Sequence, residues 1–314
     1  MTAAPVVVAL SHRLGPVLPA AVARLLQNGA ALYADTDVPA ELVQQCGAHH
    51  VGDAVQGLLL TVDLDTGAAA RWVAAGATVL ATPEPAGIAL LDAVGVMDRL
   101  RSPGGCPWDA EQTHSSLMPY LIEETYELYQ ALEDGDADAL REELGDVLLQ
   151  VLFHARVAQE SSEGFDIDAV ATELVTKLVS RHPHVFAGSE EVRTAAEQEI
   201  RWEQLKRTEK RRESNVDGVA LTQPAVALAA KLASRAAKAA LPEDLLPGDG
   251  SGAGGSLFAL SAAAKLAGED PEAALRRVAR RFADDLRAAE RSARAAGLDV
   301  GRLTQQQWRE HWPG

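Results

Sequence analysis

The sequence predicts a mainly helical protein with a small α/β unit at its N-terminal end. The 314 residues are rich in alanine and contain only 4% aromatic residues, a composition typical of helical chains. Two stretches, 117–132 and 139–156, place apolar residues at helical spacing. Before about residue 85, short apolar runs alternate with helical stretches instead, which indicates a parallel sheet covered by helices.

The N-terminal unit is expected to span residues 1–87. Its short apolar runs predict buried strands, and the stretches between them predict helices. We expect strands at 6–10, 30–34, 58–62 and 77–81, and helices at 16–26 and 68–75. The proline-containing sequence at 82–85 marks the end of this unit.

The rest of the chain divides into two helical segments. Residues 88–212 are charged and helical, residues 213–218 form a polar linker, and residues 219–314 are helical and very rich in alanine. A glycine-rich, flexible loop at 247–255 interrupts the last segment. We therefore expect three domains joined by short connections.

Charge and cysteine content exclude several classes of protein. Asp and Glu outnumber Lys and Arg by 45 to 29, which gives a formal net charge of −16. This field repels phosphate backbones, so stable nucleic-acid binding is not expected, although one small anionic ligand held through metal ions is compatible with it. Cys46 and Cys106 provide neither a disulfide framework nor a zinc spacing. No apolar run approaches the roughly 18 residues of a membrane span, so we expect a cytoplasmic protein without a membrane partner.

The first long helix, 117–132, carries acidic side chains on an apolar face. Its apolar stripe consists of Leu117, Tyr120, Leu121, Leu128, Ala131 and Leu132. Glu124 falls in the middle of this stripe, Glu127 falls at its edge, and Glu123 points further round the helix. A lone carboxylate that faces a core is costly unless it is paired or bound to a metal.

The second long helix, 139–156, carries one polar stripe among apolar residues that almost encircle it. The encircling residues predict a central, buried helix: Leu144, Val147, Leu148, Leu149, Val151, Leu152 and Phe153. The polar stripe consists of Glu143, Asp146, Gln150 and His154. A turn at 134–136 folds the two helices back against each other, so the two acidic pairs face one another.

Two facing carboxylate pairs are what a hard divalent cation requires. Four such oxygens leave coordination positions open for water and phosphate, as Mg²⁺ prefers. A single acidic pair three residues apart is usually just a solvated helix face. Here both pairs lie on faces that their neighbours predict to be inward, which favours a metal site.

The motifs resemble those of the MazG-like nucleoside triphosphate pyrophosphohydrolases. The family signature is EExxE followed by ExxD, and it stands here as Glu123-Glu124-x-x-Glu127 and Glu143-x-x-Asp146. The similarity extends over residues 94–209 and includes a Gly-Cys-Pro-Trp-Asp preface at 105–109 and further motifs at 177–186 and 201–206. Several separate motifs in the same order make this resemblance highly specific.

The resemblance implies an all-α helical bundle core and a hydrolytic activity. It assigns Glu124, Glu127, Glu143 and Asp146 as ligands of Mg²⁺, with Mn²⁺ as a possible substitute, and the reaction as cleavage of a nucleoside triphosphate to the monophosphate and pyrophosphate. Glu123 is a candidate base for the attacking water, or an ordinary exposed helix residue. The resemblance also implies a homodimer and a role in cleaning the nucleotide pool.

Basic and aromatic residues downstream are the candidates for nucleotide binding. Lys177 and Arg181 are four residues apart on a predicted helix, so they could hold phosphate oxygens together. Trp202 and Lys206 have the same spacing, and the resemblance implies that Trp202 stacks on a base. The alternative is that the three cations are solvated surface charges and that Trp202 is a packing anchor.

The flanking segments resemble degenerate domains. Residues 219–314 resemble a second MazG unit without its acidic motif, in which Gly252 and Gly255 occupy the places of Glu143 and Asp146. We expect this segment to be catalytically silent and to serve packing or oligomerisation. The first segment resembles a truncated tetrapyrrole-methylase-type domain, and it is too short for us to expect methyl transfer.

Two other classes of function fit the sequence less well. An oxygen-activating di-iron bundle would need two Glu-x-x-His motifs, and only Glu111-x-x-His114 is present. A non-catalytic nucleotide sensor or scaffold would have no need of four inward carboxylates. The enzyme hypothesis therefore leads.

Overall fold

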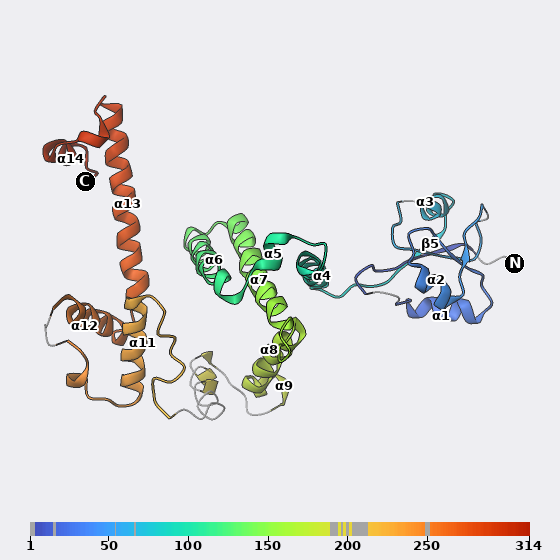
Figure 1. Ribbon diagram of the computed structural model, residues 1–314, viewed down its shortest axis with the longest axis horizontal. Coiled ribbons are helices and arrows are strands. Elements are labelled where there is room, and N and C mark those ends of the chain that lie inside the picture. The colour runs from blue at the N-terminus through green and yellow to red at the C-terminus, as the bar shows by residue number, and fades with distance from the viewer. Residues whose placement is uncertain are drawn as a thin grey trace. The chain divides into compact units, whose positions relative to one another are not determined.

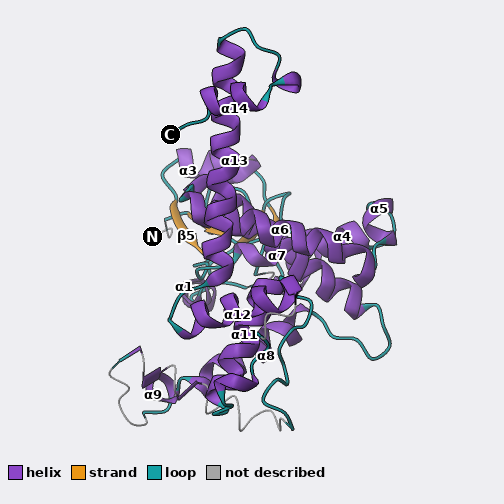
Figure 2. Cartoon of the chain, turned by 90° about the vertical axis from the view of Figure 1, so that its left-hand side faces the viewer, coloured by secondary structure: helices purple, strands orange, loops and turns teal. Residues whose placement is uncertain are grey.

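The computed structural model contains two compact units, Met1–Phe186 and Ala187–Gly314, which are described here one at a time (Figure 1). The structure describes residues 4–14, 17–53, 55–65, 67–188, 194–195, 197–198, 201–202, 213–248 and 252–314. Within these residues helices predominate and the strands all belong to one sheet (Figure 2). The prediction of a mainly helical chain with a small N-terminal sheet is confirmed, and the description all-α applies only to the residues outside that sheet unit.

The first unit begins with a five-stranded parallel sheet of order β3-β2-β4-β1-β5. Its strands are β1 (Val6–Ala9), β2 (Leu32–Ala34), β3 (His49–His50), β4 (Leu58–Thr61) and β5 (Thr78–Ala81). The four predicted strands are present. The short edge strand β3 was not predicted, because two exposed histidines give no apolar run.

Three helices cover the two faces of the sheet (Figure 1). On one face, α1 (Ala20–Gln27) and α2 (Ala40–Cys46) pack on a core that includes Val8 and Leu60. On the other face, α3 (Gly67–Ala74) packs Trp72 against Val7 and Leu59. Neighbouring strand residues point to opposite faces, so continuous apolar runs such as 6–10 supply both cores.

The first predicted helix starts later than expected, and a second helix was missed. Pro19 precedes α1 with extended backbone angles, and a proline disfavours helical geometry in the residue before it. Residues 17–19 are accordingly not helical, and Pro16 lies outside the described residues. Helix α2 spans only seven residues, between Pro39 and the left-handed Gly47, and is too short to show a clear periodicity.

The helical part of the first unit is built around a long helix hairpin. It contains α4 (Ala89–Arg101), α5 (Pro107–Glu111), α6 (His114–Asp134), α7 (Ala137–Gln159), α8 (Ile167–Arg181) and α9 (Pro183–Phe186). Helix α6 starts with a capping box between Thr113 and Ser116, and it ends at Gly135 in the left-handed conformation. The Asp136 side chain then caps the first turn of α7. These caps fix where both helices begin and end.

A small core and one buried arginine hold α4 against the hairpin. Met97, Leu117, Leu152 and Phe153 are all buried together. The Arg101 guanidinium lies over the Phe153 ring and forms two hydrogen bonds to the Glu160 carboxylate, at 2.9 and 2.8 Å. It also donates to the backbone carbonyls of Asp109 and Gln112, so it ties α4 to α5 and to the end of α7.

The expectation that α7 is buried on all sides is wrong for the single chain. Leu152 and Phe153 are buried, but the Leu144, Leu149 and Val151 side chains are 52%, 39% and 41% exposed. On α6, Tyr120 and Leu132 of the predicted inward stripe are exposed as well. Helix α4 covers one side of the hairpin, and the other side presents apolar residues to solvent.

The second unit is a set of helices packed through alanine. It contains α11 (Ala225–Lys238), α12 (Gly252–Leu266), α13 (Pro271–Ala295) and α14 (Gln305–His311), with short 3₁₀ turns η1 (Glu243–Leu245) and η2 (Val300–Arg302). Apart from Pro271, the buried apolar side chains among its described residues are alanines: Ala229, Ala230, Ala233, Ala262, Ala289 and Ala293. Throughout the described part of the chain, no helix is long and apolar enough to cross a membrane.

Candidate metal and nucleotide site

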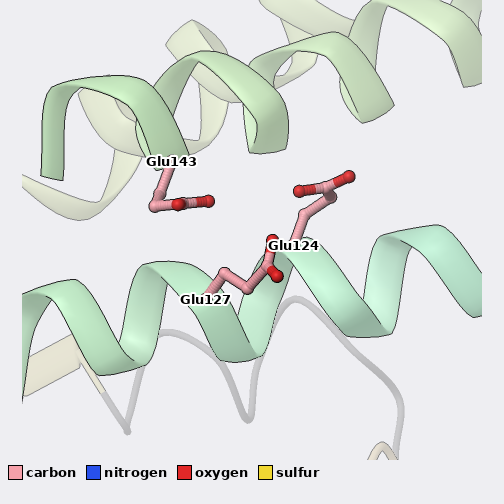
Figure 3. A group of neighbouring side chains, drawn as sticks. All are labelled: Glu124, Glu127 and Glu143. Atoms are coloured by element: carbon pink, nitrogen blue, oxygen red, sulfur yellow. The ribbon is translucent and has the colours of Figure 1, made fainter. Parts of the chain in front are cut away.

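Three glutamates from two helices meet on the inner side of the α6–α7 hairpin. Glu124 and Glu127 project from α6, and Glu143 projects toward them from α7 (Figure 3). Each offers a carboxylate oxygen, and the three oxygens all lie within 4.8 Å of one another. This separation allows all three to bind one cation.

The turn between the helices explains why these residues meet. Gly135 lies eight residues after Glu127 and eight residues before Glu143, and it lies eleven residues from both Glu124 and Asp146. At 1.5 Å per helical residue, each pair is therefore at the same height above the turn, about 12 Å for the nearer pair. A short turn at a left-handed glycine thus places the two acidic pairs opposite each other.

The electrostatics of the site are those of crowded negative charge. Partial burial raises the pKa of the Glu124 carboxyl, and the neighbouring charges of Asp146, Glu127, Glu143 and Glu123 raise it further. Desolvation likewise raises the pKa of Glu143, and the charges of Glu127, Asp146 and Glu142 add to this effect. A bound cation would reverse both pKa shifts, because it favours the ionised carboxylates.

No cation from the protein neutralises this cluster within the described residues. Glu124, Glu127 and Glu143 form no ion pair with Lys, Arg or His there. Glu143 Oε2 is buried and has no hydrogen-bond partner among the described residues. Buried polar atoms in folded proteins almost always have partners, so this oxygen fits a site that binds an ion. Oxygen ligands of this kind suit Mg²⁺ or Mn²⁺.

Asp146 and Glu123 lie beside the cluster rather than in it. The structure groups three of the four expected ligands, and Asp146 is not among these three. Its charge nevertheless raises the pKa of both Glu124 and Glu143, which shows that it is close. Glu123 is exposed next to Glu124 and affects the site through its charge.

The downstream candidates differ in their surroundings. Lys177 and Arg181 both lie on α8, but Lys177 is exposed whereas Arg181 is buried. His182 ends α8 and donates a 2.7 Å hydrogen bond to the Leu178 carbonyl. The two cations therefore do not form a pair of equally accessible phosphate ligands in the single chain.

Trp202 is half-buried in a helical stretch, and Lys206 lies outside the described residues. The predicted pairing of these two side chains is accordingly not described by the structure.

The polar stripe of α7 ends in a pair of stacked histidines that the sequence analysis did not predict. His154 stacks on His114 of α6, with ring centroids 5.1 Å apart and the two Nδ1 atoms 2.8 Å apart. Burial and the neighbouring His114 lower the pKa of His154. Gln150 lies between this pair and the acidic residues, and it is only 4% exposed. The spacing 143, 146, 150 and 154 was the available signal, since it places all four on one helix face.

Sequence-family comparisons match two parts of the chain. The MazG nucleotide pyrophosphohydrolase domain matches residues 112–186, which contain all five acidic residues of the site. The MazG N-terminal domain matches residues 5–80, which are the sheet unit.

Several proteins are similar over longer stretches. A nucleoside triphosphate pyrophosphohydrolase of Mycobacterium tuberculosis is 44% identical over 289 residues, which cover 88% of this chain and 84% of the relative. The nucleoside triphosphate pyrophosphohydrolase/pyrophosphatase MazG of Thermotoga maritima is 35% identical over 253 residues, 72% of this chain and 95% of the relative. A mazG-related protein from Thermotoga maritima, known from a crystal structure, has 31% sequence identity to this chain. The match covers 38% of this chain and 96% of that protein, with a TM-score of 0.31.

Proposed function

Because this chain belongs to the MazG family of nucleoside triphosphate pyrophosphohydrolases, we propose that it hydrolyses ribo- and deoxynucleoside triphosphates with Mg²⁺ bound between α6 and α7. The products are a nucleoside monophosphate and pyrophosphate. The ligands are Glu124, Glu127, Glu143 and Asp146, and Mn²⁺ is expected to substitute. Sanitation of the nucleotide pool in the cytoplasm is the role that this reaction suits.

The observation that carries the proposal is the group of three glutamates that form no ion pair with any described cation. Their oxygens lie within 4.8 Å of one another, and Glu143 Oε2 is buried without a hydrogen bond from any residue that the structure describes. A hard divalent ion bound here supplies neutralisation of phosphate charge and a lower pKa for a bound water. A triphosphate is the anionic ligand that an acidic protein can bind through such ions.

The remaining roles belong to the side chains around the cluster. Glu123 is exposed beside Glu124, where it can accept the proton of the water that attacks phosphorus. As the new phosphorus–oxygen bond to water forms, the bond between the α and β phosphates breaks, and the departing phosphate group carries away the electron pair. Lys177 and Lys206 would bind phosphate oxygens, and Trp202 would stack on the base. Arg181 is buried in the single chain, so it would bind phosphate only after the proposed dimer has formed.

A homodimer is the assembly that fits the exposed apolar side of the hairpin. The Ile122, Leu132 and Leu144 side chains are 57%, 60% and 52% exposed. On α8, Leu174 and Val175 are exposed as well. A second copy of the chain would cover these residues and complete a bundle around the acidic site.

Product analysis tests the reaction. ATP or a deoxynucleoside triphosphate incubated with the protein and Mg²⁺ should yield equal amounts of monophosphate and pyrophosphate, separated by anion-exchange chromatography. Release of orthophosphate without pyrophosphate would overturn the proposed cleavage position.

A further inference from the structure

The parallel sheet of the first unit contains a point where its chain connections diverge. Strands β1 and β4 are neighbours, but the connection from β1 runs through α1 to β2, toward one edge. The connection from β4 runs through α3 to β5, toward the other edge. Helices α1 and α3 lie on opposite faces of the sheet (Figure 1). In open parallel sheets, ligands bind outside the carboxyl ends of the strands at such a switch point.

A cavity lies at this place in the sheet. It has a volume of about 290 Å³, close to the lower end of the range for small-molecule sites. Residues 10–12 line it directly after β1, Val62 lines it directly after β4, and residues between Asp37 and Gln45 line it after β2. The cavity therefore opens at the carboxyl ends of three adjacent strands.

The lining combines an apolar floor with acceptor groups. Leu10 and Leu42 are buried and form the floor together with Val62. Asp37 and Glu41 are exposed and bring two carboxylates to the rim. The side chains of Gln45 and His12 complete the polar part of the lining.

Asp37 is fixed in place, and part of it remains free to bind. Its Oδ2 accepts hydrogen bonds from the Thr61 hydroxyl and from the backbone N–H groups of Val62 and Asp63, at 2.8, 2.8 and 2.6 Å. These bonds anchor the carboxylate at the end of β4. Its Oδ1 has no hydrogen-bond partner among the described residues and is available as an acceptor.

The loop after β1 is also held in place. The Ser11 hydroxyl donates to Glu84 at 2.5 Å, and Arg13 pairs with Glu84 and with Asp92, each at 2.7 Å. Because its walls are anchored on both sides, the cavity is preformed, and a ligand would not have to bear the cost of ordering it.

We propose that this cavity binds a ribonucleoside. The apolar floor suits the face of a base, and the carboxylates of Asp37 and Glu41 suit the two ribose hydroxyls, as an acid after a strand does in dinucleotide-binding sheets. A volume of about 290 Å³ lies at the small end of the range for small-molecule sites, which favours a compact ligand such as a single nucleoside. Two carboxylates at the rim repel phosphate, so the ligand is the free nucleoside rather than a nucleotide. This site is independent of the glutamates on α6 and α7.

Calorimetry on the full-length protein tests the proposal. Adenosine, guanosine, cytidine and uridine are titrated in EDTA, which removes cations from the acidic site of the helix hairpin. At least one should bind. Its 2′,3′-dideoxy analogue and its 5′-monophosphate should each bind at least tenfold more weakly, because one lacks the diol and the other adds repelled charge.

A matched pair of variants locates the binding. Glu41→Gln removes one exposed carboxylate from the rim and should weaken nucleoside binding at least tenfold. Asp53→Asn makes the same kind of change at an exposed position of this unit outside the cavity lining and should leave binding unchanged. Methyl NMR should show shifts at Leu10, Leu42 and Val62 on adding the nucleoside, with the methyl groups of α6 and α7 unmoved.

Three results would overturn the proposal. In the first, none of the four nucleosides binds. In the second, the dideoxy analogue binds as tightly as its parent nucleoside. In the third, Glu41→Gln binds the nucleoside with the same affinity as the unmodified protein. The dideoxy comparison uses the unmodified protein, so the proposal is tested even if the variant fails to fold.

Discussion

Two helix pairs in this protein pack in opposite ways. Helices α11 and α12 in the second unit are joined through buried alanines such as Ala230, Ala233 and Ala262. Helices α6 and α7 in the first unit instead face each other with Glu124, Glu127 and Glu143 between them. Alanine packing costs no desolvation of charge, whereas crowded carboxylates raise one another's pKa values and oppose folding. The comparison contrasts a helix pair stabilised by close alanine packing with one whose crowded carboxylates lower its stability, a cost that the proposed metal ion would offset.

The largest expected effect is the loss of catalysis when one carboxylate of α6–α7 is neutralised. Glu124→Gln should lower kcat at least about a hundredfold, because a metal-ligand contact is lost while the helix remains. Asp146→Asn should behave in the same way. Steady-state pyrophosphate release measures kcat, and far-UV circular dichroism checks the helix content.

The control for this loss lies on the same helix. Glu133→Gln makes an identical change near the end of α6, at an exposed position outside the three-glutamate group, and should retain activity. A fully active Glu124→Gln protein would refute the metal assignment.

The next effect is on stability and concerns the alanine-packed pair. The Ala233 side chain is completely buried, so Ala233→Leu should overpack α11 and destabilise the second unit by about 1–3 kcal/mol. Urea unfolding followed by circular dichroism measures the change. Ala225 begins the same helix, and Ala225→Leu at this exposed position is the control. Equal stabilities of the two variants would show that the alanine contacts are not tight.

A smaller effect is the pH dependence of stability without metal. Folding raises the pKa of Glu143, so this carboxyl favours the folded state at low pH, and its contribution is lost as pH rises through the raised folded pKa. Glu143→Gln removes the ionisation. In EDTA, its Tm should therefore exceed that of the unmodified protein at pH 7, and the difference should shrink toward pH 4. Differential scanning calorimetry over this range checks the sign, and a lower Tm for the variant at pH 7 would contradict it.

The smallest effect on catalysis is expected from removing helices α11–α14 of the second unit. Deletion from Gly218 onward should leave kcat within about threefold, since the acidic site lies entirely on α6 and α7. Pyrophosphate release measures the activity, and analytical ultracentrifugation of the full-length and shortened proteins shows whether the proposed dimer forms in each. If catalysis disappears while the remainder stays folded and dimeric, the second unit contributes to the site.

The acidic site was predictable because local rules place it. Helical periodicity put Glu124 and Glu143 on inner faces, and Gly135 lies at equal chain distance from both acidic pairs. The caps around this glycine are sequence-local, so the register of the hairpin follows from the sequence.

What the sequence could not reveal depends on neighbours that are distant in the chain. Helical periodicity predicts that Leu144 and Val151 lie on an apolar face. It does not predict whether a helix of the same chain covers that face, and in the structure both side chains are exposed. The burial of Arg181 and the stacking of His114 on His154 also arise from tertiary packing. Short elements such as α2 and β3 have too few residues for a periodic signal.

The most direct test of the central claim is Mn²⁺ binding measured by electron paramagnetic resonance, with free Mn²⁺ quantified at increasing protein concentration. The unmodified protein and Glu133→Gln should bind the ion with equal affinity, and Glu143→Gln should bind it at least tenfold more weakly. If Glu143→Gln binds Mn²⁺ as tightly as the unmodified protein, the three glutamates do not form the metal site.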